Sequence, residues 1–289
     1  MGDSVEFDVV VVGSCNLDLV STTTHLPSLG ETLRAIAYAE HAGGKGLNQA
    51  VACARMGART AFIGCVGNDS AGTMLRDLLN SEGIDTSQLV TVDAPTGRAF
   101  ITVDASGENT IVIVAGANAH LDKTVITVPS SKVLLAQLEI PLSVVTQVFT
   151  EARNAITVFN PAPAAVIPNE LLSLCDYAVP NETESEALGG TKFLLRSGVN
   201  TVITTLGERG AEISDATSTT AVTPYPVNAI DTVGAGDAFV GALCAELARG
   251  ETIEHAARIA SIAGALATTV HGAMPSLPTR AAVMSLYAD

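Results

Sequence analysis

The chain has no tryptophan, and aromatic residues account for only 4% of its 289 positions. Hydrophobic residues nevertheless reach 47%, so the core must consist mainly of alanine, valine, leucine and isoleucine. This supply is ample for a globular core, whereas the length is compatible with one large α/β domain or with two smaller ones. The order of strands and helices has to decide between them.

Positive charge is scarce, because 15 lysine and arginine residues face 30 aspartate and glutamate residues, which gives a net charge of −15. Such an acidic protein is not expected to bind nucleic acid or anionic membranes. A phosphate site in this chain needs local positive potential from backbone N–H groups, a few lysine or arginine side chains and a metal ion.

Signals for secretion, membrane insertion and disulfide formation are missing. Residues 1–8 are acidic, and no apolar run reaches about 18 residues without a polar interruption. The five cysteines are scattered and form no Cys-x-x-Cys pair, which is typical of buried thiols in a reducing compartment. We therefore expect a soluble, cytoplasmic protein.

Several catalytic motifs are absent as well. There is no Gly-x-x-x-x-Gly-Lys-Ser/Thr loop, which argues against a P-loop kinase, and no Gly-x-Gly-x-x-Gly follows the first strand. No Gly-x-Ser-x-Gly elbow occurs, which disfavours a hydrolase of that design. The five histidines show no His-Glu-x-x-His spacing, so no zinc site is expected.

What the sequence does contain is a regular alternation of apolar strands and helices. Residues 8–13 are a β-branched run typical of a central strand buried on both faces, and helices are predicted over 44–57 and 70–81. Further strands are predicted over 61–66, 132–138, 157–161, 177–180 and 201–206. Repeated β-then-α units predict a Rossmann-like α/β fold, with a mostly parallel central sheet flanked by helices.

Two segments do not fit that sheet. Residues 98–104 and 109–114 read as an antiparallel hairpin, and residues 17–40 are rich in threonine, serine and proline without helical periodicity. We expect these segments, over about 16–42 and 96–115, to form a small β lid inserted into a single domain that spans 1–289. Phe100, Ile111 and Ile113 are expected to share a covered face of this lid.

Polar residues follow the predicted strands directly. They are Asn16, Asp18, Gln137, Glu139, Asn160, Asn181, Glu184, Thr205 and Gly207. Ligands bind at the carboxyl ends of parallel strands, so these residues are expected to meet at one rim. Each residue taken singly is also explained by capping of a loop.

The segment Gly43–Asn48 (Gly-Gly-Lys-Gly-Leu-Asn) opens the first long helix. Its glycines allow a ligand to approach the backbone, and Lys45 and Asn48 offer groups for neighbouring hydroxyls. A sugar presents such paired hydroxyls, and Asn16 and Asp18 supply a matching amide and acceptor. An ordinary first helical turn is the alternative.

The segment Asp231–Asp237 (Asp-Thr-Val-Gly-Ala-Gly-Asp) precedes the apolar residues 238–243, which read as a buried helix. The N–H groups of such a glycine-rich helix start bind anions. The Asp237 carboxylate at the same turn suits a base for phosphoryl transfer to a hydroxyl. The alternative is a glycine-rich connection that only caps the helix.

Taken together, these elements resemble the ribokinase-like family of carbohydrate kinases over nearly the whole chain. The Asp-Thr-x-Gly-Ala-Gly-Asp element defines the family, and the other matching segments resemble its ribose-phosphorylating branch. The matching segments are 12–18, 43–50, 66–72, 137–141, 160–164, 180–184 and 231–237.

The resemblance implies a role for each matching residue. Asp237 would be the base, and Gly234, Ala235 and Gly236 would form the hole for the transferring phosphoryl group. The pentose would be held by Asn16, Asp18, Gly43, Gly44, Lys45, Asn48 and Glu139. Asn181 and Glu184 would act near the phosphates of ATP and their Mg²⁺. The ATP site would include Thr205, Leu206, Gly207, Glu208, Arg209, Gly210, Gly236 and Ser261.

The resemblance also implies a monovalent-cation site, usually for K⁺, behind the phosphoryl hole. Its ligands would be Asp231, Val233, Ala267, Val270, Gly272 and Ser276, mostly through backbone carbonyls. Position 261 is serine where related proteins often have asparagine, so contacts to adenine are expected to change. Position 233 is valine where threonine is common, and because its carbonyl is the expected ligand, little effect on the cation site is expected.

The function implied is ATP-dependent phosphorylation of D-ribose at O5, in a homodimer that interlocks through the β lid. A sister kinase for deoxyribose, a nucleoside or a hexose is an alternative, and a non-catalytic sugar-binding regulator is another. Asn16 and Asp18 suit two adjacent ring hydroxyls, which deoxyribose lacks.

Overall fold

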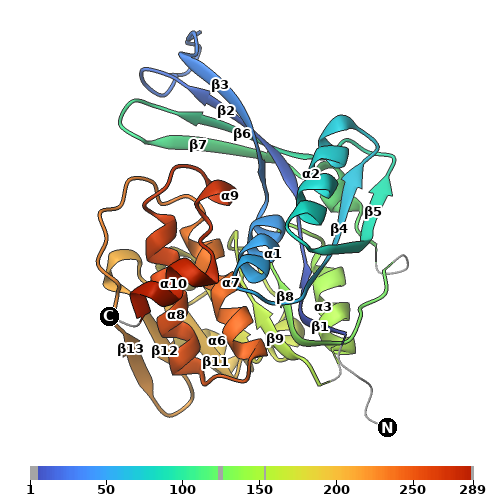
Figure 1. Cartoon of the computed structure of the whole chain (residues 1–289), viewed down its shortest axis with the longest axis vertical. Coiled ribbons are helices and arrows are strands. Elements are labelled where there is room, and N and C mark those ends of the chain that lie inside the picture. Colours follow the sequence, from blue (N-terminus) through green and yellow to red (C-terminus); the bar gives the residue numbers. More distant parts are fainter. Residues whose placement is uncertain (1–5, 123–125, 153, 288–289) are drawn as a thin grey trace.

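The computed structural model describes residues 6–122, 126–152 and 154–287 (Figure 1). Residues 1–5, which include most of the segment expected not to be a signal sequence, lie outside this range. Within the described ranges, no helix combines the length and the apolar character needed to cross a bilayer.

A nine-stranded sheet forms the centre of the molecule, in the order β13-β12-β11-β10-β9-β8-β1-β4-β5. All neighbours from β5 to β11 run parallel, while β12 and β13 add an antiparallel edge. The strands are β1 (Phe7–Val12), β4 (Thr60–Gly67), β5 (Asp85–Val92), β8 (Ser131–Ala136), β9 (Ile156–Phe159), β10 (Tyr177–Ala178), β11 (Thr201–Thr205), β12 (Ala211–Ser214) and β13 (Thr219–Val222). The predicted α/β fold is thus confirmed.

Helices cover both faces of this sheet. One face packs against α1 (Lys45–Arg55), α2 (Ser70–Ser81), α7 (Ala235–Ala248), α8 (Ile253–Ala267) and α10 (Arg280–Tyr287). The other packs against η1 (Gly116–His120), α3 (Leu142–Glu151), α4 (Asn169–Leu172) and α6 (Thr191–Arg196). Short elements at the rim are α5 (Glu182–Ala187), η2 (Gly207–Arg209) and α9 (Ala273–Ser276).

Strand β1 shows why a continuous valine run lies in the middle of this arrangement. Val9 and Val11 point into the core under α1 and α7, and Val10 and Val12 point into the core on the opposite side. Successive side chains of a strand alternate between faces, so only a strand covered on both sides buries all of them.

The sequence did not predict β5, β12 or β13. In β5 only Leu89 is fully buried, and the remaining side chains are polar or partly exposed. The hairpin of β12 and β13 lies at the far edge and is rich in threonine and serine. Strands at the edge of a sheet are not buried on both faces, so their sequences lack the continuous apolar run that identifies a central strand.

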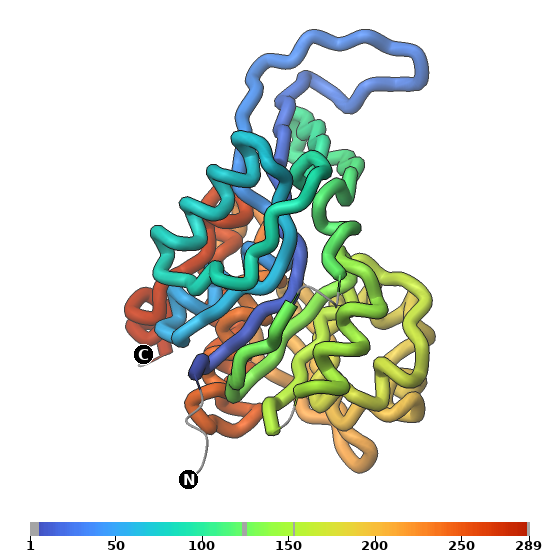
Figure 2. Tube along the Cα trace, turned by 90° about the vertical axis from the view of Figure 1, so that its right-hand side faces the viewer, coloured from blue at the N-terminus to red at the C-terminus, as the bar shows by residue number. Residues whose placement is uncertain are grey.

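A second, four-stranded sheet projects from the body of the molecule (Figures 1 and 2). Its order is β3-β2-β6-β7, and its strands are β2 (Asn16–Thr22), β3 (Ala37–Gly43), β6 (Gly97–Val103) and β7 (Asn109–Val114). The predicted hairpin is β6 and β7, and its turn closes with a 3.0 Å hydrogen bond from the Asp104 N–H to the Glu108 carbonyl.

The expected common face for Phe100, Ile111 and Ile113 is wrong. The register pairs Phe100 with Val112, whereas Ile113 pairs with Ala99. Paired residues share a face and successive residues alternate, so Phe100 lies on the face opposite to the two isoleucines. The turn at Asp104–Glu108 sets this register, and a common face for the three residues is incompatible with the pairing across that turn. Both faces of the projecting sheet therefore expose apolar side chains.

Candidate active site

Helix α7 begins at the glycine-rich turn singled out in the sequence. Gly234 is its N-cap, in the left-handed region at φ 83°, and a Cβ there would lie 2.9 Å from the Cα of Ala273. The first N–H groups of a helix have no partner within the helix and favour an anion. The Ala235 N–H donates to the Thr232 carbonyl at 3.3 Å, and the turn borders a cavity of about 210 Å³ that Gly234, Gly236 and Asp237 help to line.

Asp237 lies in the first turn of α7 and is 9% exposed. Its two carboxylate oxygens accept hydrogen bonds from α1, one from Asn48 Nδ2 at 3.0 Å and one from Gln49 Nε2 at 2.9 Å. The remaining polar atom of the Asn48 amide, Oδ1, is buried without a partner among the described residues. A ligand hydroxyl beside Asp237 would satisfy this oxygen.

Lys45 begins α1 and lines the same cavity. Its backbone N–H donates to Glu139 Oε2 at 3.0 Å, and the Ser14 hydroxyl donates to the same oxygen. Burial lowers the pKa of the Lys45 ammonium, but the carboxylates of Asp237, Glu139 and Glu184 outweigh it, so that the pKa lies above its ordinary value. Lys45 is therefore charged and supplies the local positive potential that the acidic chain requires.

Asp18 of β2 lies against the glycines that precede α1. A Cβ at Gly43 would lie only 2.1 Å from Asp18 Oδ2, so glycine is required there. Burial, and then the negative charges of Glu139 and Asp237, raise the pKa of Asp18 to about 7. Asp18 thus lies close to the carboxylates of Glu139 and Asp237, an arrangement that suits several hydroxyl donors.

Asn16 lies at the start of β2 and is 2% exposed. Its Oδ1 accepts a 2.7 Å hydrogen bond from Asn118 Nδ2 in η1, which leaves the Asn16 Nδ2 group as the free donor. Gly44, at φ 91°, brings the start of α1 against this strand, where a Cβ would lie 3.0 Å from the Asn16 N atom. The predicted sugar-binding residues therefore converge from β2, α1 and the loop after β8.

Asn181 and Glu184 lie on the opposite wall of the cavity, with Thr205. They form a capping box at the start of α5, in which the Glu184 N–H donates to Asn181 Oδ1 and the Asn181 N–H donates to Glu184 Oε2. This accounts for one oxygen of each side chain. Glu184 Oε1 and Asn181 Nδ2 stay available to phosphates, and the carboxylate fits Mg²⁺, which prefers oxygen ligands.

The residues predicted for the rest of the ATP site lie beyond this cavity. Residues 206–210 form the turn between β11 and β12, where the Leu206 N–H donates to the Gly210 carbonyl at 2.8 Å. Arg209 in this turn forms an ion pair with Glu182 of α5. Ser261 of α8 donates to the Thr223 carbonyl at 3.4 Å, so its hydroxyl already has a partner.

The predicted cation ligands come from two segments that the structure brings together. Asp231 accepts a hydrogen bond from the Val233 N–H at 3.0 Å and another from the Gly272 N–H at 2.8 Å. Residues 231–233 are thereby joined to residues 267–272 behind the start of α7. Both oxygens of the Asp231 carboxylate thus already accept hydrogen bonds. The hydroxyl of Ser276 donates to the Ala273 carbonyl.

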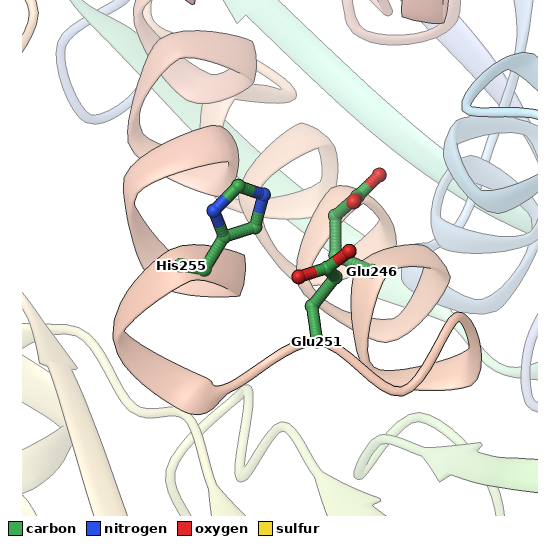
Figure 3. Close-up of side chains that lie close together, drawn as sticks. All are labelled: Glu246, Glu251 and His255. Atoms are coloured by element: carbon green, nitrogen blue, oxygen red, sulfur yellow. The ribbon is translucent and has the colours of Figure 1, made fainter.

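A separate group of potential metal ligands, Glu246, Glu251 and His255, lies where α7 leads into α8 (Figure 3). Glu246 is 1% exposed and already forms ion pairs with Arg280 and Arg249. Two guanidinium groups already bind the Glu246 carboxylate, which ties α10 to α7 and accounts for the burial of Glu246.

Sequence analysis missed Gln49, Asn118, Ser14 and Thr232 as site residues. Thr232 lines the cavity, and the other three hold predicted site residues through hydrogen bonds. Gln49 belongs to the matching segment 43–50, but the sequence assigned it no role. Asn118 follows the second sheet by a few residues and gave no signal that it returns to Cys15 and Asn16.

Residues 6–280 match the pfkB family of carbohydrate kinases. The chain belongs to this family. It is 40% identical to a ribokinase of Haemophilus influenzae over 94% of this chain and 95% of that protein. It is 34% identical to a deoxyribokinase of Salmonella typhi, over 94% of this chain and 96% of that protein.

A solved structure extends the comparison to three dimensions. The ribokinase of Arabidopsis thaliana complexed with ribose and ATP superposes with a TM-score of 0.86 at 31% identity, over 97% of this chain and 98% of that chain. The resemblance to ribokinase-like carbohydrate kinases is therefore confirmed for the fold as well as for the sequence.

Proposed function

We propose that this protein is a ribokinase, which transfers the γ-phosphoryl group of ATP to O5 of D-ribose. The observation that carries the proposal is the position of Asp237. Its carboxylate lies at the N-terminus of α7, in a cavity that also holds Lys45, Asn181 and Glu184. A base and an anion-binding helix end are thus side by side, as phosphoryl transfer to a hydroxyl requires.

In this proposal Asp237 takes the proton from O5 as that oxygen attacks the γ-phosphorus in line. The N–H groups of Gly234, Ala235 and Gly236 stabilise the charge that develops on the transferring group. Lys45 adds positive charge from the side of the sugar. The proton of the hydroxyl moves to Asp237, and ADP leaves with the electron pair of the broken P–O bond.

The sugar contacts follow from the free polar atoms. Asn16 Nδ2 and the Asp18 carboxylate receive two adjacent ring hydroxyls, and the unpaired Asn48 Oδ1 accepts from a third. Glu139 holds the start of α1 in place and faces the same ligand, with Gly43 and Gly44 allowing close approach. A sugar without a 2-hydroxyl loses part of this set, which favours ribose over deoxyribose.

Mg²⁺ and ATP are assigned to the opposite wall. Asn181 and Glu184 would hold the phosphates and their Mg²⁺, which neutralises phosphate charge when bound. The turn of residues 206–210 and Ser261 would face the nucleoside. The Mg²⁺ and phosphate assignment rests on the start of α5, and the nucleoside assignment rests on the turn after β11 and on α8.

We also infer activation by K⁺ at the segments joined by Asp231. Its carboxylate orients the turn before α7, so an ion beside it would fix the N–H groups of the phosphoryl hole. Activity is expected to rise on replacing a large organic cation in the buffer with KCl. Equal rates in the two buffers would remove this part of the proposal.

The second sheet is proposed to be a lid of a single domain, which also joins two subunits. Asn16 and Asp18 belong to strand β2 of this sheet, and β6 pairs with β2. Movement of the sheet would therefore expose or cover the sugar. Its exposed apolar side chains support a homodimer. All five cysteines are unpaired and buried, which supports a cytoplasmic location.

ADP release with ribose, deoxyribose, fructose and adenosine, each with and without K⁺, tests the function. Turnover is expected with ribose at the highest kcat/KM. A clear preference for deoxyribose, fructose or adenosine would replace ribokinase by a sister kinase. Binding of ribose without turnover of any of the four compounds would favour the sugar-binding regulator.

A further inference from the structure

Three buried side-chain amides lie beside Asp237, and one of them, Asn160, also lines the cavity. Gln49 of α1 and Gln137 after β8 are both 0% exposed, and Asn160 after β9 is 7% exposed. Such groups cost free energy to bury unless they are hydrogen-bonded, and apolar side chains would fill the same space more cheaply. The fold alone therefore does not explain why three amides converge here.

The amides form one connected network. Gln49 Nε2 donates to Asp237 Oδ1 and to Asn160 Oδ1, both at 2.9 Å. Gln49 Oε1 accepts from Gln137 Nε2 at 2.6 Å. Asn160 Nδ2 donates to the Val179 carbonyl at 2.7 Å. Gln49 is the central member, since every other bond reaches Asp237 through it.

Two acceptors fix the direction of the whole network. The Asp237 carboxylate and the Val179 carbonyl only accept hydrogen bonds, so the NH₂ groups of Gln49 and Asn160 must face them. Gln49 Oε1 then faces Gln137, which must turn its own NH₂ group inward. Gln137 Oε1 is left buried without a partner among the described residues, as this orientation requires.

The surroundings hold this network rigidly. A Cβ at Gly241 of α7 would lie 2.3 Å from the Ala52 Cβ and 3.0 Å from the Gln49 carbonyl oxygen, so α1 and α7 are in close contact. A Cβ at Gly13 would lie 2.2 Å from Gln137 Oε1, so the strand end leaves that side chain little room. The position of Gln49 is therefore determined by the backbone on both sides.

Charged groups around Asp237 act on its carboxylate, and the amide network can fix the orientation of that carboxylate. Asp237 interacts with the negative charges of Asp18 and with the positive charge of Lys45, which also faces Glu139 and Glu184. The Asp237 carboxylate is therefore attracted by Lys45 and repelled by Asp18. Neutral donors from Asn48 and Gln49 hold both oxygens without adding a charge, and they define the plane of the carboxylate.

We propose that Gln49 is a positioning residue for the catalytic base, supported by Gln137 and Asn160, and that it orients the Asp237 carboxylate toward the attacking sugar hydroxyl. The inference rests on the proposed phosphoryl transfer. Gln49 itself is fully buried and would act through its hydrogen bond to Asp237. Its loss displaces the base and lowers kcat, because misplacement of a reacting group by about 1 Å costs on the order of 100-fold in rate.

The first test is Gln49→Leu, with Gln147→Leu on α3 as the matched control. The Gln147 side chain donates to Glu151 on the same helix, far from the cavity. Gln49→Leu is expected to lower kcat by roughly 10- to 100-fold, with the KM values for ribose and ATP changed little. Gln147→Leu is expected to match the wild type. An unchanged kcat in Gln49→Leu would overturn the inference.

A double-mutant cycle separates positioning from a general loss of structure. Gln49→Leu is introduced into Asp237→Asn and single-turnover rates are compared. If Gln49 acts through Asp237, the second substitution changes the residual rate by less than about twofold, because residues that act as a unit are not additive. Losses that multiply would show that Gln49 supports only the fold.

Gln49→Glu tests the positioning role through the pH dependence of kcat, which a change in packing alone would not alter. The new carboxylate can donate to Asp237 only while the pair shares a proton, and with both ionised the two repel each other. The ratio of its kcat to that of the wild type is expected to rise between pH 9 and pH 6. The other charged groups around Asp237 and Lys45 are Asp18, Glu139 and Glu184, and they are present in both enzymes. A ratio independent of pH would contradict the inference.

The controls distinguish failure of this inference from failure of the proposed function. A wild-type enzyme that releases no ADP with ribose would overturn both. An active wild type with an equally active Gln49→Leu would overturn the positioning role alone. If Gln49→Leu does not fold, Gln137→Leu takes its place in the cycle, with a smaller expected loss of kcat, and additive losses there would count against the inference.

Discussion

Asn118 and Asn16 share a 2.7 Å hydrogen bond between their side chains, although 102 positions separate them. Asn118 also accepts from the Cys15 N–H at 3.0 Å and donates to the Cys15 carbonyl at 3.2 Å. The Cys15 backbone thus fixes the orientation of the Asn118 amide, and the Asn118 amide in turn fixes the orientation of the Asn16 side chain. A Cβ at Gly97 would lie 2.3 Å from both side chains, so glycine is needed beside them.

Asn118→Leu is expected to weaken ribose binding. The substitution leaves Asn16 free to turn and the Cys15 backbone groups without their partner. The KM for ribose should rise about tenfold while the KM for ATP stays constant, and the free energy of unfolding should fall by about 1–3 kcal/mol. Steady-state kinetics and urea unfolding measure the two effects. Asn200→Leu, at the amino end of β11, is the control, and an equal rise in the KM for ribose there would refute the role.

Asp237→Asn is expected to abolish the base while leaving the sugar site in place. Loss of a positioned base costs on the order of 10²–10⁴ in rate. We expect kcat to fall by that factor and ribose binding, measured by calorimetry, to change little. Asn48 and Gln49 both donate to this side chain, so the asparagine satisfies only one of them. An unchanged kcat would exclude Asp237 as the base.

Sugar binding is expected to depend on pH through Asp18, whose pKa is raised to about 7 by burial and by Glu139 and Asp237. Below this pH the carboxyl is protonated and loses its charge as an acceptor. The KM for ribose should therefore rise as the pH falls from 8 to 6, and this dependence should be lost in Asp18→Asn. A flat wild-type profile would contradict the assignment.

The same group makes stability depend on pH in a defined direction. Between pH 3.8 and about 7 the folded state holds a proton on Asp18 that the unfolded state releases, so this group lowers the free energy of unfolding as the pH rises. The cost above pH 7 is at most about 4 kcal/mol. Asp18→Asn should be more stable than the wild type at pH 8, by a smaller margin at pH 5, and no more stable than the wild type near pH 3.8. Asp77→Asn, exposed on α2, should show no such difference in urea unfolding.

Substitution of the lid face that carries Asp18 is expected to dissociate the dimer. Ile111 and Ile113 lie on that face because Ile113 pairs with Ala99, which pairs with Asp18. Charged residues there would be buried unpaired, so Ile111→Lys/Ile113→Lys should sediment as a monomer. Val112→Lys, one residue away on the opposite face, should stay dimeric. A monomeric wild type would exclude the dimer, and dissociation by Val112→Lys alone would move the interface to the other face.

The sequence by itself was sufficient for the six parallel strands β1, β4, β8, β9, β10 and β11, and it singled out the polar residues expected at their carboxyl ends. Valine runs such as that of β1 predict buried parallel strands, because only two-sided burial favours continuous apolar residues. The segment Asp231–Asp237 and the glycines before Lys45 predict anion and sugar contacts, since these depend on local backbone conformation. Polar strand ends such as Asn181 were also expected at this edge.

The tertiary structure alone decided which of these groups touch. The bonds of Asp237 to Asn48 and Gln49 cross 189 and 188 positions, and neither is encoded in local periodicity. Likewise, the turn between β6 and β7 sets the register that separates Phe100 from Ile113. Long-range contacts and strand register depend on the packing of distant elements, and amides such as Gln49 and Asn118 have no local pattern that reveals their partners.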